Sequence, residues 1–130
     1  MVVPGEIREQ LVEHAVAEAP NEACGLIAFR DGVAKRYLPA ENATPSPYYF
    51  ELRPRDPLDF FLEDEGYELA VFHSHLSSPP RPSRTDVENI GLWRGKPYLI
   101  LSLRTGELAG WRIDADRIVS VPLSERAPKH

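Results

Sequence analysis

The chain has 130 residues, of which 42% are hydrophobic and 27% are charged, and its formal net charge is −5. These values are typical of one globular domain over residues 1–130, and they exclude a disordered or fibrous chain. The acidic balance also argues against a nucleic-acid partner, because phosphate backbones are bound mainly by clustered Lys and Arg.

The apolar runs are short, and those at residues 69–72 and 98–101 fall far below the ~20 residues that a membrane helix requires. Residues 1–20 contain no apolar core of the kind found in signal peptides. We therefore expect a cytoplasmic protein that does not enter a membrane. The single cysteine, Cys24, excludes an internal disulfide and a zinc site made of several thiolates, so a metal would have to be held by histidine and carboxylate.

The first elements are predicted to be a helix and a hairpin. Apolar residues recur at helical spacing over residues 4–20, between two prolines that suit the start and the stop of a helix. The apolar runs 23–29 and 33–38 flank Asp31 and Gly32, and an Asp-Gly pair in that position indicates two antiparallel strands joined by a tight turn.

A loop, a helix and a buried strand follow. Residues 40–47 contain two prolines and no periodicity, which predicts a surface loop before a short strand at 48–52. An Asp-Pro pair predicts the start of a second helix over 57–66, and the apolar run 68–74 predicts a central strand. The remaining predictions are a proline-rich segment, a short helix and three strands, at residues 75–82, 83–93, 98–103, 107–114 and 118–123.

Metal-binding side chains are concentrated at the end of the predicted central strand. His73 and His75 are two residues apart, so both point to the same face if the strand continues that far. After a spacer of seven residues, Ser83 and Asp86 begin the next predicted helix, and the prolines of the spacer must turn the chain. Two imidazole nitrogens and one carboxylate oxygen leave a fourth tetrahedral position open, which is the arrangement of catalytic zinc.

Each half of this pattern also has a simpler explanation. A His-x-His pair occurs in many strands that bind no metal, and Ser83 with Asp86 can form a capping box for free helix N–H groups. The two halves together, at a strand–loop–helix junction, are much more specific for a metal site. Glu22 is a candidate base for a hydrolytic water, but it is one of 20 acidic residues and can equally be a solvated residue at a strand end.

Taken together, these residues resemble a known family. Glu22 within Asn-Glu-Ala-Cys-Gly-Leu-Ile, followed by His-Ser-His, the seven-residue spacer and Ser-x-x-Asp, is similar to the motif of the JAMM (MPN+) zinc metalloproteases. The resemblance extends over most of the chain, and the compact length is similar to that of the small stand-alone prokaryotic members.

The resemblance implies a fold, an activity and a set of roles. The fold is an α/β domain with a mixed, partly curved β-sheet flanked by helices, related to that of cytidine deaminases. One Zn²⁺ per chain is implied at His73, His75 and Asp86, with Glu22 as general acid/base and Ser83 stabilising the oxyanion. The implied activity is peptide or isopeptide hydrolysis after the C-terminal Gly-Gly tail of a ubiquitin-like or sulfur-carrier protein.

Two other functional classes use a related fold. A non-catalytic MPN-type scaffold would have lost its ligands, so the complete ligand set argues against it. A nucleobase deaminase needs Pro-Cys-x-x-Cys, which a chain with one cysteine lacks. The sequence does not decide whether the chain forms a homo-oligomer. Cys24 is most simply a packing residue. Ser83 presents a conflict, because one hydroxyl would have to cap a helix and bind the oxyanion.

Overall fold

The computed structural model describes residues 1–115 and 117–126, and its seven strands form one sheet in the order β3-β2-β1-β4-β5-β6-β7. The strand predicted to be central is the middle one, β4. β4 pairs with β5 in parallel, and the other described neighbours pair antiparallel. The strands are β1 (Cys24–Arg30), β2 (Val33–Asn42), β3 (Leu52–Pro54), β4 (Glu68–His75), β5 (Pro97–Ser102), β6 (Leu108–Asp114) and β7 (Arg117–Val121).

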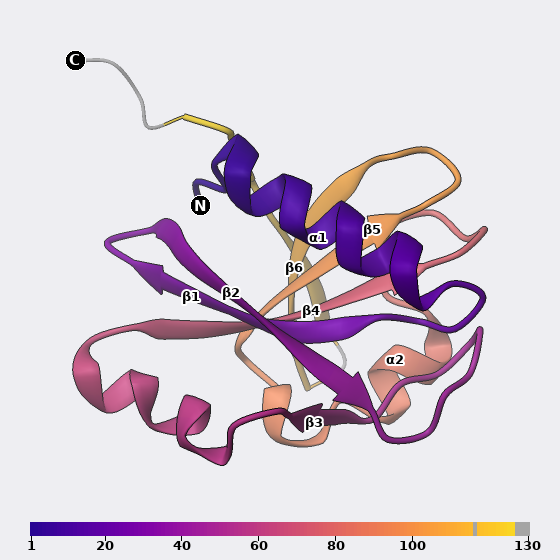
Figure 1. The fold of residues 1–130 in the computed structure, drawn as a ribbon, viewed down its shortest axis with the longest axis horizontal. Coiled ribbons are helices and arrows are strands. Elements are labelled where there is room, and N and C mark those ends of the chain that lie inside the picture. Colours follow the sequence, from indigo (N-terminus) through magenta and orange to yellow (C-terminus); the bar gives the residue numbers. More distant parts are fainter. Residues whose placement is uncertain (116, 127–130) are drawn as a thin grey trace.

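Helical elements cover both faces of the sheet (Figure 1). They are α1 (Gly5–Glu18), α2 (Arg84–Glu88) and two 3-10 helices, η1 (Pro57–Glu65) and η2 (Gly91–Trp93). α1 buries Leu11 against one face, in a cluster with Phe72 of β4. On the other face Leu62 of η1 packs in a cluster with Leu26 of β1. This mixed sheet flanked by helices confirms the predicted α/β class.

Alternation along β4 decides which side chains reach each face. Ala70 and Phe72 belong to the core under α1, whereas Val71 packs on the opposite side with Ile90. Successive side chains of a strand point to opposite faces, and β4 continues to His75. His73 and His75 are therefore both directed away from α1, as their spacing predicted.

The predicted strand 48–52 is wrong in its extent, because β3 contains only Leu52–Pro54. The chain before it is a loop, residues 43–51. The side-chain oxygen of Asn42 accepts hydrogen bonds from the Glu51 and Thr44 N–H groups, which replaces strand pairing in this loop. Local side-chain bonds of this kind compete with regular secondary structure.

The predicted helix 83–93 is interrupted, and the helix predicted at 57–66 is a 3-10 helix. α2 ends at Glu88, and Gly91 then has a φ of +52°, a left-handed conformation that an α-helix cannot continue. The hairpin is confirmed, since Asp31 and Gly32 both have positive φ, as a two-residue turn between antiparallel strands requires.

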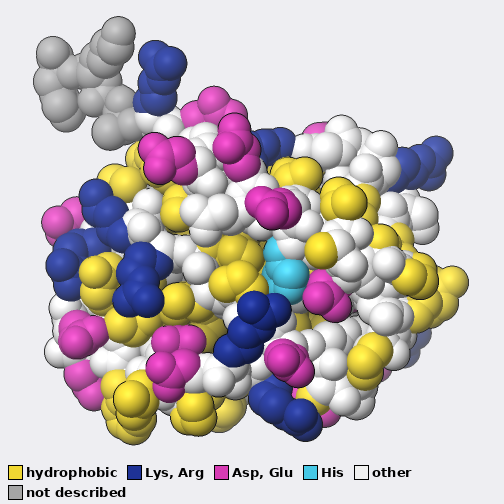
Figure 2. Space-filling view, viewed as in Figure 1, with side chains coloured by type: hydrophobic (Ala, Val, Ile, Leu, Met, Phe, Trp, Pro, Cys, Tyr) yellow, Lys and Arg dark blue, Asp and Glu magenta, His cyan; other side chains and the backbone are white. Residues whose placement is uncertain are grey.

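The described part of the chain contains no helix with both the length and the hydropathy needed to cross a bilayer. On the face seen in Figure 2, Lys and Arg side chains lie among Asp and Glu side chains.

Candidate metal centre

The two histidines lie at the carboxyl end of β4. His73 is fully buried, His75 is 4% exposed, and their Nε2 atoms lie 3.0 Å apart. Nδ1 of His75 lies 2.9 Å from the carbonyl oxygen of Pro79. Because a carbonyl oxygen can only accept a hydrogen bond, this Nδ1 carries the proton. When the ring is neutral, its Nε2 atom therefore presents a lone pair toward His73.

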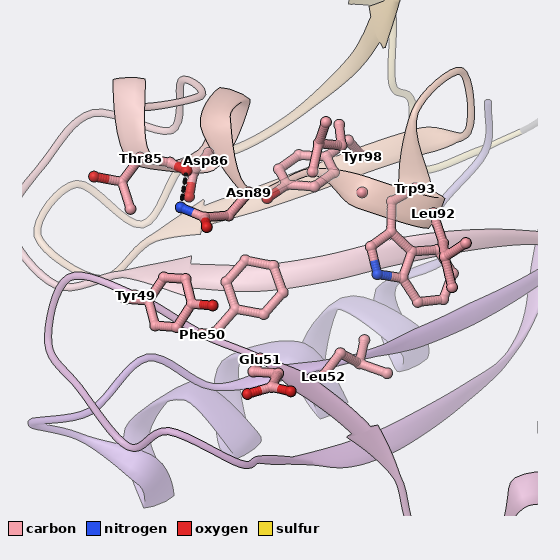
Figure 3. Close-up of a pocket in the computed structure, with 12 residues that line it drawn as sticks. Tyr49, Phe50, Glu51, Leu52, Thr85, Asp86, Asn89, Leu92, Trp93 and Tyr98 are labelled. Carbon is pink, nitrogen blue, oxygen red and sulfur yellow. Dashed lines mark hydrogen bonds between the residues drawn. The ribbon is translucent and has the colours of Figure 1, made fainter.

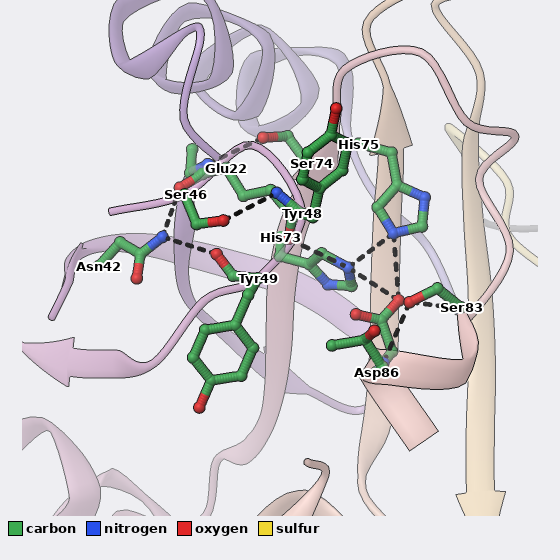
Figure 4. A network of polar contacts seen from close by, with 12 residues as sticks. Glu22, Asn42, Ser46, Tyr48, Tyr49, His73, Ser74, His75, Ser83 and Asp86 are labelled. Atoms are coloured by element: carbon green, nitrogen blue, oxygen red, sulfur yellow. Dashed lines mark hydrogen bonds and ion pairs between the residues drawn. The ribbon is translucent and has the colours of Figure 1, made fainter. Parts of the chain in front are cut away.

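Asp86 reaches the histidines from the first turn of α2. Its Oδ2 atom lies 3.2 Å from Nε2 of His73 and 3.1 Å from Nε2 of His75 (Figure 4). A capping box orients this carboxylate. The Ser83 N–H donates to Asp86 Oδ2 over 2.9 Å, and the Asp86 N–H donates to Ser83 Oγ over 3.0 Å. The capping explanation and the ligand explanation of Ser-x-x-Asp therefore apply to the same pair of residues.

The three side chains fit a metal ion. Their ligand atoms, Nε2 of His73, Nε2 of His75 and Oδ2 of Asp86, lie 3.0 to 3.2 Å from one another. Around tetrahedral zinc, with bonds of about 2.0–2.1 Å, neighbouring ligand atoms lie about 3.3 Å apart. The bond from His75 Nδ1 to a backbone carbonyl is also the usual way in which a ligating imidazole is oriented.

The electrostatics of His73 and Asp86 favour the states that bind a cation. Burial lowers the pKa of His73 despite the nearby Asp86 carboxylate, so this ring is kept neutral. Burial would raise the pKa of Asp86, but the two histidines and the Ser83 N–H outweigh it and hold this pKa well below its usual range. For His75, burial is outweighed by hydrogen bonds to Asp86 and Pro79, and its pKa rises, so a metal ion competes with a proton for this ring. An ionised carboxylate beside a neutral imidazole is ready to ligate.

Glu22 is a buried acid beside this group, on the segment between α1 and β1. Its Oε1 atom lies 3.9 Å from Nε2 of His73 and has no hydrogen-bond partner among the residues described. Its side chain is 4% exposed, and burial, together with the Asp86 carboxylate, raises the pKa of Glu22 to about 8. A cation held by the histidines would lower this pKa by electrostatic attraction. The fold therefore places this acid, to which the resemblance gave the role of general acid/base, beside the histidines.

The family described as prokaryotic homologues of the JAB domain matches residues 4–114, which is most of the chain. The chain belongs to this family. The match confirms the resemblance to JAMM proteases that the motif residues indicated.

Relatives of this JAB-domain protein include two named peptidases. It is 29% identical to the CysO-cysteine peptidase of Mycobacterium tuberculosis over 132 residues, which cover 95% of this chain and 90% of the relative. It is 39% identical to a probable TtuB-protein conjugate cleaving protease of Thermus thermophilus over 106 residues, or 77% of this chain and 68% of the relative. A solution structure of a Desulfitobacterium hafniense protein superposes with a TM-score of 0.80 and 30% identity, covering 94% of this chain and 90% of that one.

Two clefts of the JAB-domain protein open beside the candidate metal centre. The aromatic cleft, of about 320 Å³, lies between the segment before β3 and the segment from α2 to β5, and Asp86 forms part of its wall (Figure 3). Its large apolar side chains are Tyr49, Phe50, Leu52, Ile90, Leu92, Trp93 and Tyr98. Leu92 is 87% exposed at its outer end.

The hydroxyl cleft, of about 220 Å³, opens on the side of Glu22 and Ser83. Short polar side chains form much of its wall, and Glu22 is the one acidic or basic side chain in it apart from His75. The other wall residues are Pro47, Tyr48, Leu76, Ser77, Ser78 and Thr85. Both clefts therefore meet at the residues that the motif singled out.

Two supporting residues had no role in the sequence analysis. Ser74 exchanges two hydrogen bonds with Ala23, through its Oγ (2.9 Å) and its N–H (3.0 Å), and so fixes the start of β1 beside β4. Phe50 stacks on the ring of His73, with centroids 4.5 Å apart and planes at 20°. The place of Ser74 between the histidines is a signal that could have found it, but Phe50 lies in the segment predicted as a short strand, where no pattern marks a contact with His73.

Proposed function

We propose that this JAB-domain protein is a zinc-dependent peptidase or isopeptidase that cleaves after the C-terminal Gly-Gly tail of a ubiquitin-like or sulfur-carrier protein. The observation that carries the proposal is the convergence of three potential ligands beside the buried carboxylate of Glu22, whose Oε1 atom has no hydrogen-bond partner among the described residues. The substrate class is supported by relatives named for CysO-cysteine and for TtuB-protein conjugates. We assign the reaction to the cytoplasm, where a free buried thiol such as Cys24 is common.

Zinc suits a site of two imidazoles and one carboxylate, and three protein ligands leave one position open for chemistry. A zinc ion held by His73, His75 and Asp86 supplies Lewis acidity, which acidifies water and polarises a carbonyl group. The remaining steps are carried out by side chains of the protein itself.

Glu22 moves the proton. Its carboxylate accepts a proton from the attacking water and donates it to the nitrogen of the scissile bond as the C–N bond breaks, so one amide and one water give one acid and one amine. Ser83 stabilises the carbonyl oxygen as negative charge develops on it. The Oγ atom of Ser83 accepts the Asp86 N–H, and a hydroxyl that accepts a bond still has its own hydrogen to donate. The two roles of Ser83 therefore do not compete.

Replacement of Ser83 separates these two roles. Ser83→Ala is expected to cost about 0.5–2 kcal/mol of stability through the lost cap and to lower turnover by about a hundredfold or more through the lost oxyanion donor. Ser83→Asn and Ser83→Asp should recover the melting temperature but not the rate, whereas Ser83→Thr, which keeps the hydroxyl, should recover part of both. Melting curves and turnover numbers test this, and a fully active Ser83→Asp enzyme would exclude the oxyanion role.

The two clefts receive different parts of the substrate. Because Glu22 must deliver its proton to the leaving nitrogen, the leaving group lies in the hydroxyl cleft, which Glu22 lines. The tail that ends in Gly-Gly then enters the aromatic cleft, which reaches the centre through Asp86. The folded body of the substrate follows the tail and meets the outer end of this cleft at Leu92.

Leu92→Asp tests this assignment. We expect the KM for a ubiquitin-like substrate to rise roughly tenfold, because an apolar contact is lost and a charge is placed in its path, while kcat changes little. Val119→Asp is the matched control, since Val119 is also exposed and lies on β7, outside both clefts. Steady-state kinetics decide the matter, and equal KM values for the two variants would contradict the assignment.

The activity itself is tested with ubiquitin-like proteins that are extended after Gly-Gly, one through a peptide bond to cysteine and one through an isopeptide bond to lysine. Intact-mass spectrometry should detect a product ending in Gly-Gly, a chelator should abolish it, and added zinc should restore it. Binding of these proteins without cleavage, by a chain that holds no zinc, would instead support the scaffold function.

A further inference from the structure

Asn42, the last residue of β2, makes full use of its side-chain amide. Its Nδ2 donates to the carbonyl oxygens of Glu22 and Tyr49, both over 3.1 Å. Its Oδ1 accepts from the N–H groups of Thr44 (3.1 Å) and Glu51 (3.0 Å). Figure 4 shows the two donated bonds reaching Glu22 from one side and the loop from the other. Both hydrogens and both lone pairs of the amide are therefore engaged.

The loop tied down by this amide, residues 43–51, borders both clefts. Tyr48 forms part of the hydroxyl cleft, while Tyr49 and Phe50 form part of the aromatic cleft. The carbonyl oxygen of Ser46, in the same loop, also accepts a hydrogen bond of 2.8 Å from the Glu22 N–H group. The backbone of Glu22 is thus bound to this part of the chain through both its N–H and its carbonyl group.

Apolar packing holds this loop mainly at Phe50. The Phe50 ring stacks on His73 and packs against the core cluster that contains Tyr98, whereas Tyr48 is 78% exposed. Backbone pairing within the loop includes the bond from Ala43 N–H to Glu51 oxygen. The four bonds of the Asn42 amide therefore tie the two ends of the loop together, and the Phe50 ring is a second anchor.

We propose that Asn42 is a positioning residue for the reaction, because its amide holds the general acid/base and the walls of both clefts in one arrangement. This inference rests on the proposed function, since it assigns Glu22 as the proton carrier. A misplacement of about 1 Å in a catalytic constellation can lower the rate about a hundredfold. Loss of the amide is therefore expected to act on turnover without removing a metal ligand.

Asn42→Asp and Asn42→Ala test the proposal kinetically. Asp keeps an acceptor for Thr44 and Glu51 but places an oxygen against the two carbonyls, whereas Ala removes all four bonds. In both variants kcat per bound zinc should fall at least tenfold and KM should rise, at a temperature well below each melting point. Ile7→Val, a change in the core under α1, is the control for general destabilisation. A kcat within twofold of the wild type, or a loss no larger than in the control, would overturn the proposal.

A second measurement does not depend on activity. Amide hydrogen exchange of Thr44 and Glu51 should be slow in the wild type and at least tenfold faster in Asn42→Ala, with no change in Ile7→Val. If the exchange rates of both amides were unchanged in Asn42→Ala, Asn42 would not be what holds the loop in place, and the proposal would be wrong. A wild type that binds zinc but cleaves no extended ubiquitin-like protein would instead refute the proposed function, and the exchange result would still decide the role of Asn42.

Discussion

Glu22→Gln is expected to lower kcat by a hundredfold or more while zinc content and melting temperature stay unchanged. The side chain keeps its size and has no hydrogen-bond partner at Oε1 among the described residues, so the substitution breaks no bond of the folded state at that atom. The amide, however, cannot accept the proton from water, and general acid–base catalysis contributes about 10²–10⁴-fold to rates. Turnover numbers and elemental analysis of the same preparation measure both quantities.

Glu65→Gln is the matched control, because Glu65 is an exposed acid on η1, outside both clefts. It should leave the rate unchanged. Near-normal turnover of Glu22→Gln would show that another group carries the proton, even if the metal site is correct.

Removing a ligand should abolish metal binding as well as activity. Protein purified without added metal is expected to hold about one zinc per chain, and His73→Ala or Asp86→Asn should lower this at least tenfold, since two ligands form a much weaker site than three. Zinc should also raise the melting temperature of the wild type but not of these variants, because a ligand that binds only the folded state stabilises it.

His14→Ala provides the comparison for loss of a buried histidine outside the centre. His14 lies on α1, and its Nδ1 is 2.6 Å from the hydroxyl of Tyr37, so its loss should lower stability but not zinc content. Metal-free wild type with ordered histidines would contradict the metal assignment and support the scaffold function.

The parts of the fold that the sequence predicted are those with a local physical cause. The period of α1, the Asp31–Gly32 turn and the apolar run of β4 each depend on neighbouring residues alone. The spacing of His73 and His75 likewise required only that β4 continue, which it does.

The rest depended on contacts between distant segments. Glu22 reaches the histidines because β1 pairs with β4, with Cys24 opposite His73, and no local pattern encodes that register. Most of the strand predicted at 48–52 does not form, because the side-chain amide of Asn42 binds the backbone of this segment instead. Its partner Glu51 lies nine residues further along the chain. The helix predicted at 83–93 ends at Glu88, where the N–H and the side-chain amide of Asn89 both donate to the Thr85 carbonyl oxygen.

The parallel pairing of β4 with β5 bears on how substrate preference can diversify in such a domain. The chain leaves the sheet at His75 and returns at Pro97, and this excursion carries Ser83, Asp86 and much of both cleft walls. Lengthening a surface connection costs little, about 0.6 kcal/mol for each doubling of its length. Evolution can therefore remodel the recognition surface by insertion in this connection while the histidine-bearing strand keeps its neighbours, so that new specificities arise without rebuilding the core.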